Sequence, residues 1–224
     1  MVFLGFLVPT VLFFFSNFNL SGQTFSLDSN GVTVKCSGCS NGDTGTVGGV
    51  TYTAVDNTTI RLTADGDWDT IVTTLVTDMS GLFSGDVDFN ENISSWHTVS
   101  VTTMEDMFRG ASAFNQDLSK WDTSGVLNMQ QTFYNAIAFT NNLNDWDVSS
   151  VTDMDGMFRG ATSFNQPLNS WTVSNVLSMS RMFQEATSFN QPLNNWNVSN
   201  VKYMQFLFRQ SDFNQPLNSW TVSN

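Results

Sequence analysis

Basic side chains are scarce in this sequence. The 224 residues include eight Lys and Arg against twenty Asp and Glu, which gives a formal net charge of −12 at pH 7. Nucleic-acid binding needs a basic stripe, and anionic lipid surfaces attract polybasic segments, so neither partner fits this composition. Hydrophobic residues still make up 41% of the chain and include twenty Phe and seven Trp. That content is enough for a packed core and excludes a disordered polar tract.

Cysteine and histidine are also nearly absent. The two cysteines, Cys36 and Cys39, stand in the short motif "CSGC", and His97 is the one histidine. A zinc site would need two more ligands, and a thioredoxin-like redox pair would need a βαβ unit that the flanking sequence lacks. We therefore expect a structural disulfide or two free thiols, with secretion favouring the local disulfide. We predict neither a metal nor a cofactor.

Long apolar runs are absent except at the start of the chain. Residues 2–15 are almost all apolar, a length typical of the hydrophobic region of a signal peptide and short for a membrane span. The usual basic residues before such a region are missing, and a buried strand or helix is the alternative. We predict a signal peptide at residues 1–23, an extracellular or cell-surface location, and no membrane insertion after its removal.

The rest of the chain is dominated by an internal repeat of 25 residues. The same interval separates members of a methionine, a tryptophan and a phenylalanine series, and a one-residue deletion shifts the last tryptophan. A period of this length, sustained about six times, predicts stacked units that bury a shared core. The series are Met79, Met104, Met129, Met154, Met179 and Met204; Trp96, Trp121, Trp146, Trp171, Trp196 and Trp220; and Phe83, Phe108, Phe133, Phe158, Phe183 and Phe208.

Two patterns alternate within each unit. Apolar residues at Val151, Met154, Met157, Phe158 and Ala161 have the steps of three and four that predict a short helix. The following Leu168-x-x-Trp171-x-Val173 has the spacing of a leucine-rich repeat, and its period of two predicts a short strand with Trp171 and Val173 inward.

These patterns predict an α/β solenoid of the leucine-rich-repeat kind, with one short strand and one short helix per 25-residue repeat. The solenoid would cover residues 68–224. Residues 24–67 contain short alternating runs such as "GVTVKC" and "GVTYTAV", separated by turn residues, and predict a small β-rich N-terminal cap. Recurring amides at Asn115, Asn165, Asn190 and Asn214 fall at a bend, where stacked side chains are expected to bond backbone groups of the next coil.

No motif in the chain predicts catalysis. The stretch "DGDWD" at residues 65–69 resembles the start of a calcium loop but lacks its later glycine and glutamate, so a solvated turn is favoured. Carboxylate pairs such as Asp145 and Asp147 exist, yet none recurs in an apolar setting that would raise a pKa. We therefore predict that the protein is not an enzyme.

The outward positions of the predicted strands are the best candidate binding surface. These outward positions vary between units, whereas the inward positions stay constant. Variable surface positions can determine binding specificity, although random drift of a solvated surface gives the same pattern. If the tryptophans instead faced solvent, a carbohydrate platform of Trp, Asn and Gln ladders would be the alternative. The candidate binding residues are His97, Lys120, Asp122, Asp145, Asp147, Thr172 and Asn197.

The unit "VTDMDGMFRGATSFNQPLNSWTVSN" resembles the repeat of BspA-like leucine-rich-repeat surface proteins, from about Val76 to the end. The resemblance implies a surface-displayed scaffold that mediates adhesion or binds a protein or extracellular-matrix ligand. It implies no catalytic residue. The chain ends without a capping repeat, so we expect either a fragment or an open last coil that allows self-association. A structural, self-assembling surface-layer spacer is therefore a further alternative.

Overall fold

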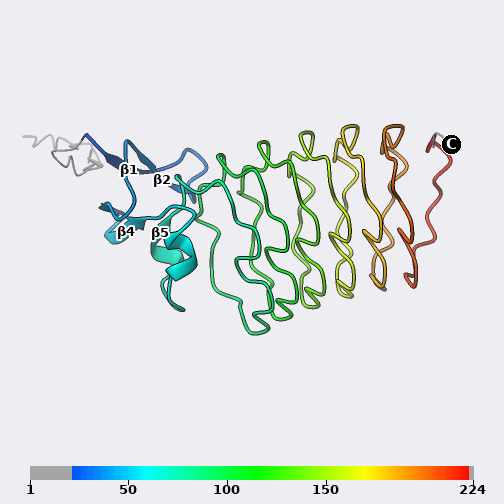
Figure 1. Ribbon diagram of the computed structural model, residues 1–224, viewed down its shortest axis with the longest axis horizontal. Coiled ribbons are helices and arrows are strands. Elements are labelled where there is room, and N and C mark those ends of the chain that lie inside the picture. The colour runs from blue at the N-terminus through cyan, green and yellow to red at the C-terminus, as the bar shows by residue number, and fades with distance from the viewer. Residues whose placement is uncertain (1–21, 222–224) are drawn as a thin grey trace, which may run out of the picture.

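The computed structural model describes residues 22–221, and the predicted signal peptide lies almost entirely outside that range. A β-rich part at the N-terminal side is followed by a row of stacked coils that extends to the end of the described chain (Figure 1). The named elements are β1 (Thr24–Leu27), β2 (Val34–Ser37), β3 (Thr44–Val47), β4 (Val50–Ala54), the 3₁₀ helices η1 (Thr59–Leu62) and η2 (Trp68–Thr70), and β5 (Ile71–Val72). None of the described helices has the length and hydrophobicity to cross a membrane.

The N-terminal part contains two small sheets. β1 and β2 form an antiparallel hairpin in which Phe25 faces Cys36, and β3 and β4 form a second antiparallel pair. β5 adds to β4 in parallel and leads the chain into the first coil. Alternating residues of these strands are buried in a small core of Phe25, Val34, Cys36, Ala54 and Val72. This core is separate from the one inside the coils.

The repeated apolar residues of successive coils stack on one another. Phe108 and Phe133 lie one coil apart with ring centroids at 5.4 Å, and Phe114 and Phe139 form a second column at 5.9 Å. Trp171 and Trp196 are parallel at 6.3 Å. The members of the methionine, phenylalanine and tryptophan series are buried from Met79 to Trp196, and Met204, Phe208 and Trp220 are partly buried, so the predicted shared interior is confirmed.

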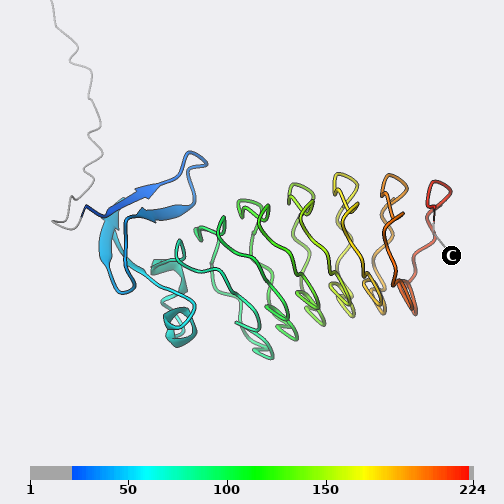
Figure 2. The ribbon, with the colours of Figure 1, turned by 45° about the horizontal axis from the view of Figure 1, so that its top comes forward.

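Backbone hydrogen bonds join each coil to the next. Single-residue parallel bridges connect one residue per coil, and they form a column of Asp78, Thr103, Asn128, Asp153, Ser178 and Tyr203. We call this the bridge column. The amide of Met104 donates to the carbonyl of Asn128 at 3.0 Å, and the amide of Phe108 donates to Thr132 at 2.9 Å. Figure 2 shows the coils side by side along the long axis.

The predicted α/β solenoid with one helix per repeat is wrong. No α-helix occurs among residues 22–221, and the expected helical segments are chains of tight turns. The amide of Met107 bonds the carbonyl of Met104 three residues back, and Asp106 and Gly110 have φ of 56° and 73°. An α-helix needs φ near −63° and amides bonded four residues back. Here other amides of the segment bond the neighbouring coil, which leaves no helical ladder.

The predicted strand around each tryptophan is also wrong. The amide of Trp171 bonds Leu168 and the amide of Val176 bonds Val173, both as local turns. The structure places the inter-coil bridges in the bridge column, within the segment expected to be helical. Beyond β5, no strand longer than one residue occurs in the described chain. The inward direction of Trp171 and Val173 is nevertheless confirmed, since both are buried.

The predicted amide ladder is confirmed. The amide of Asn115 donates to Oδ1 of Asn90, and the amide of Asn190 donates to Oδ1 of Asn165, at 2.9 and 3.0 Å. Nε2 of Gln191 reaches the carbonyl of Asn165, one coil away. Side-chain amides thus supply the partners that backbone groups need where the coil bends.

Candidate binding surface

Each tryptophan fixes the segment that carries the predicted binding residues. The indole N–H of Trp171 donates to the carbonyl of Leu143 in the preceding coil at 2.8 Å, and that of Trp146 donates to Leu118 at 3.0 Å. A buried indole N–H needs such a partner, and the carbonyl that it bonds belongs to a leucine that recurs in successive repeat units. The tryptophans therefore anchor a rigid turn-rich segment whose alternate side chains point outward.

The seven predicted binding residues lie on this turn-rich segment and not on a strand. Lys120, Asp122, Asp145, Asp147, Thr172 and Asn197 are exposed, and His97 is half-buried. We call the surface formed by the residues on either side of each tryptophan the tryptophan-flank surface. Because equivalent positions repeat every coil, residues 122, 147, 172 and 197 form one column, and residues 120 and 145 share another.

Several of these side chains also hold the following turn. Oδ1 of Asp122 accepts a bond from the amide of Ser124, and Oδ1 of Asp147 accepts one from the amide of Ser149. The hydrogen bonds from the Ser149 hydroxyl and amide lower the pKa of Asp147 below its usual value. Asn197 holds the equivalent turn through its own Oδ1 and Ser199. An Asp-to-Asn exchange in this column can therefore remove charge and preserve the turn.

The structure brings three of the predicted residues together with the β1–β2 hairpin. His97, Lys120 and Asp122 line a hollow of about 240 Å³ that the hairpin turn at Asp28 and Asn30 closes from the other side. The carbonyl of Ser95 also accepts a bond from the amide of Val34 in β2, which fixes the hairpin on this coil. The hollow is polar and contains both signs of charge.

Burial is the largest influence on His97 in this hollow. It lowers the pKa of the imidazole, the carboxylates of Asp28 and Asp122 oppose the change, and the ammonium of Lys35 reinforces it. Nδ1 of His97 is buried with no hydrogen-bond partner among residues 22–221. The neutral imidazole is thus the form that the folded chain favours.

We expect the stability of the protein to fall as the pH is lowered through the histidine range. The folded pKa of His97 is below its unfolded value of about 6.5, so the unfolded chain binds the proton first. This contribution is complete above pH ~6.5 and is lost as the pH falls toward the lower folded pKa. Urea unfolding between pH 7.5 and 5.5 should show a shallower pH dependence for His97→Gln. Equal slopes for both proteins would contradict the assignment.

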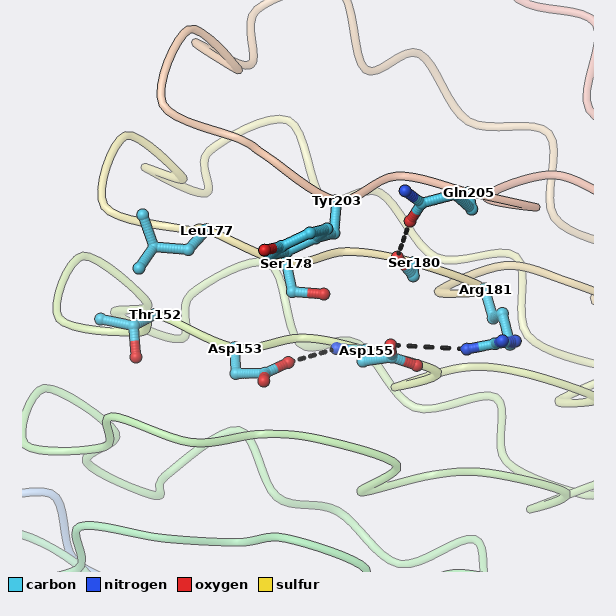
Figure 3. Close-up of a pocket in the computed structure, with 9 residues that line it drawn as sticks. All are labelled: Thr152, Asp153, Asp155, Leu177, Ser178, Ser180, Arg181, Tyr203 and Gln205. Carbon is cyan, nitrogen blue, oxygen red and sulfur yellow. Dashed lines mark hydrogen bonds and ion pairs between the residues drawn. The ribbon is translucent and has the colours of Figure 1, made fainter.

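A second hollow was not predicted from the sequence. It has a volume of about 500 Å³ and spans three consecutive coils next to the bridge column (Figure 3). Burial raises the pKa of Asp155 there, the nearby Arg181 opposes the rise, and Asp153 adds to it. The only sequence signal was Tyr203, the one aromatic residue in the bridge column. The lining residues are Thr152, Asp153, Asp155, Leu177, Ser178, Ser180, Arg181, Tyr203 and Gln205.

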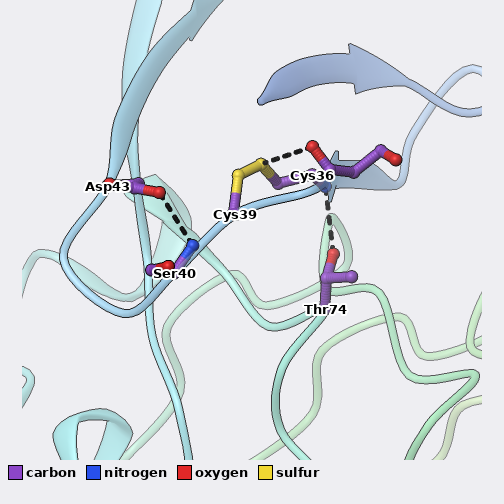
Figure 4. Close-up of a disulfide and its surroundings, with 6 residues drawn as sticks. Cys36, Cys39, Ser40, Asp43 and Thr74 are labelled. Carbon is purple, nitrogen blue, oxygen red and sulfur yellow. Dashed lines mark hydrogen bonds between the residues drawn. A yellow bond between two sulfur atoms is a disulfide. The ribbon is translucent and has the colours of Figure 1, made fainter. Parts of the chain in front are cut away.

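The two cysteines have a structural position. Cys36 and Cys39 form a disulfide at the end of β2, and the amide of Cys36 donates to the hydroxyl of Thr74 at 3.0 Å (Figure 4). The bond therefore lies where the β1–β2 hairpin meets the first coil. Among residues 22–221 no group of three His, Cys, Asp or Glu is placed to hold a metal ion.

The fold and this surface define a class of protein: a stack of 25-residue coils with a constant interior and a variable exterior. The family model described as "Mycoplasma protein of unknown function, DUF285" matches residues 52–151 and 138–224. These matches cover more than half of the chain, so the protein belongs to this repeat-containing family. Comparison with curated proteins and with solved structures finds no match.

Proposed function

We propose that the protein is an extracellular or cell-surface scaffold that binds another protein through the tryptophan-flank surface. One observation carries the proposal. Within each unit the buried positions repeat with little change, whereas the exposed positions beside each tryptophan differ from coil to coil. Packing requires the first pattern, and a surface that recognises a specific partner uses the second.

Two further observations support this function. The apolar run at the start of the chain is typical of a secreted protein. The repeat unit also resembles that of BspA-like surface proteins, a resemblance that implies adhesion or protein binding.

The tryptophan-flank surface is rich in carboxylates, since Asp122, Asp145 and Asp147 are exposed on adjacent coils. A partner with a basic surface, such as an extracellular-matrix protein, is therefore the best electrostatic fit.

The alternative of a carbohydrate platform requires solvent-exposed tryptophan rings. Trp96, Trp121, Trp146, Trp171 and Trp196 are all buried and cannot offer a ring face to a sugar. Protein binding is the better supported function for this surface.

We expect the triple variant D122N/D145N/D147N to bind at least about fivefold more weakly to basic matrix proteins. Each exchange removes one attractive charge, and an exposed ion pair contributes only a modest binding free energy, so the three losses together give this modest factor. The measurement is biolayer interferometry of the intact protein on a panel of immobilised, purified matrix proteins at physiological salt. Raising the salt should shrink the difference between the two proteins, because exposed charges are screened.

A matched control separates the site from the net charge. Asp86, Asp88 and Asp212 are exposed and lie away from the tryptophan flanks, and D86N/D88N/D212N removes the same three charges. This control should bind as the unchanged protein does. An equal loss of binding in both triple variants would show that the effect comes from the change in net charge and not from this surface. Unchanged binding of D122N/D145N/D147N would exclude this surface as the site, and no binding to any panel member would contradict the adhesive function.

A further inference from the structure

The second hollow is formed where three coils place dissimilar side chains next to one another. Asp153, Ser178 and Tyr203 follow one another in the bridge column, and their backbones are joined by parallel bridges. The adjacent column contributes Thr152 and Leu177. Figure 3 shows these residues on three successive coils, with Asp153, Ser178 and Tyr203 one above another. Since bridged chains lie ~4.8 Å apart, the hollow spans about 10 Å from Asp153 to Tyr203.

Two apolar side chains in this hollow are not used for packing. Tyr203 is 55% exposed and Leu177 is 40% exposed, as are a few other large apolar side chains of the coils, such as Leu127 and Phe206. The other positions of the bridge column are polar, namely Asp78, Thr103, Asn128, Asp153 and Ser178. A lone aromatic ring in an otherwise polar column offers a binding face that the stacking of the coils does not require.

The polar side chains of the hollow are arranged to favour a cation. Asp153 and Asp155 supply two carboxylates, and Arg181 supplies one guanidinium, 3.7 Å from a carboxylate oxygen of Asp155. The amide of Asp155 donates to Oδ1 of Asp153 at 2.8 Å, which holds that carboxylate beside the column. The hydroxyl of Ser180 donates to Oε1 of Gln205 at 2.7 Å and orients the amide. One carboxylate is thus left without a matching cation in the hollow.

We propose that this hollow binds a lysine or arginine side chain of a partner protein. The cationic end would lie against the ring of Tyr203 and near Asp153, and the aliphatic stem would pack on Leu177. Aromatic faces attract such cations, and carboxylates accept their N–H groups. The net charge of −12 attracts basic partners over a longer range. The inference rests on the proposed protein-binding function and adds the chemistry of the partner.

The experiment uses the intact protein labelled with 3-fluorotyrosine. Its three tyrosines, Tyr52, Tyr134 and Tyr203, give three fluorine resonances that single Tyr→Phe variants assign. The probes are Nα-acetyl-arginine amide, Nα-acetyl-lysine amide, the neutral isostere Nα-acetyl-citrulline amide, and methyl α-glucoside. We expect the two cationic probes to shift the Tyr203 resonance alone, with citrulline and the glucoside leaving it in place.

Two variants test the contacts without disturbing the coil. Asp153→Asn should raise the Kd of the cationic probes about threefold, as expected for loss of one exposed charge pair. Asn128 occupies the equivalent position one coil earlier and holds its turn through Oδ1, as Asp153 does, so the exchange fits the fold. Tyr203→Ser should weaken binding about two- to fivefold by calorimetry, whereas Tyr203→Phe, which keeps the ring, should bind nearly as the unchanged protein does.

The outcomes distinguish this site from the tryptophan-flank surface. A Tyr203 shift that persists in D122N/D145N/D147N supports the hollow, whatever that triple variant does to matrix binding. A shift that disappears in the triple variant overturns the inference and leaves the proposed function in place. No Tyr203 shift with either cation, an equal shift with citrulline, or a shift with the glucoside alone also overturns it, the last in favour of a saccharide site.

Discussion

Trp171→Ala is expected to lower the free energy of unfolding by about 3–5 kcal/mol, the range for removing a large aromatic side chain from a packed core. Trp171 is 3% exposed, and its ring lies 6.2 Å from that of Phe158 and 6.3 Å from that of Trp196. Alanine would leave a cavity between two coils and would also remove the donor to the carbonyl of Leu143. Denaturant unfolding followed by circular dichroism measures the loss.

Two companion variants separate the parts of this effect. Trp171→Phe keeps an aromatic ring but removes the indole donor, while the Leu143 carbonyl keeps the bond from the amide of Trp146. A loss of about 0.5–1.5 kcal/mol is therefore expected, the net contribution of one hydrogen bond. Thr172→Ala changes the exposed neighbour and should alter stability by less than about 0.5 kcal/mol. If Trp171→Ala were no more costly than Thr172→Ala, the tryptophan column would not be a core. Hydrogen exchange should show the largest loss of protection in the coils on either side of residue 171.

The double variant G156A/G160A is expected to destabilise the protein by about 2–4 kcal/mol. Gly156 and Gly160 have φ of 62° and 68°, a region that costs a residue with a side chain ~1–2 kcal/mol. An added Cβ at Gly160 would also overlap the side chain of Asn135 in the preceding coil. The same unfolding measurement applies to this variant.

The sign of the Gly156 effect tests the backbone conformation directly. In the helix that the sequence predicts, Gly156→Ala would stabilise the segment by up to about 1 kcal/mol. In the observed turn it should destabilise. Gly156→Asn is the control, because asparagine tolerates positive φ and should cost less than alanine. A stabilised Gly156→Ala protein would contradict the turn and restore the helical interpretation.

The two proposed binding surfaces offer different groups to a partner. The tryptophan-flank surface offers carboxylates on successive coils, and the hollow beside the bridge column offers a ring and a carboxylate for a single side chain. The two are only about six residues apart along each coil, as from Asp147 to Asp153. A basic segment of a partner could therefore contact both, which is why the variants at each surface are needed to separate them.

The local backbone of each coil differs from the predicted helix for a physical reason. The stripe from Val151 to Ala161 has helical steps, but three- and four-residue steps also arise when consecutive tight turns return every third or fourth side chain to one core. The distinguishing signal was present, since Gly156 lies inside the expected helix and Gly160 at its end. Glycine at such positions permits positive φ, and Asp106, Gln131 and Arg181 adopt it in the same column without being glycine.

The sequence by itself determined the repeat length, the residues of the interior and the direction of each tryptophan, because burial of apolar surface depends on spacing alone. Only the tertiary structure decided how the backbone reaches those positions. Its amides bond either the same turn or a neighbouring coil, and which of the two they bond depends on residues about 25 positions away. The two hollows also depend on the tertiary structure. His97 lies beside the hairpin turn, and Tyr203 and Asp153 line one hollow, only after the coils are stacked.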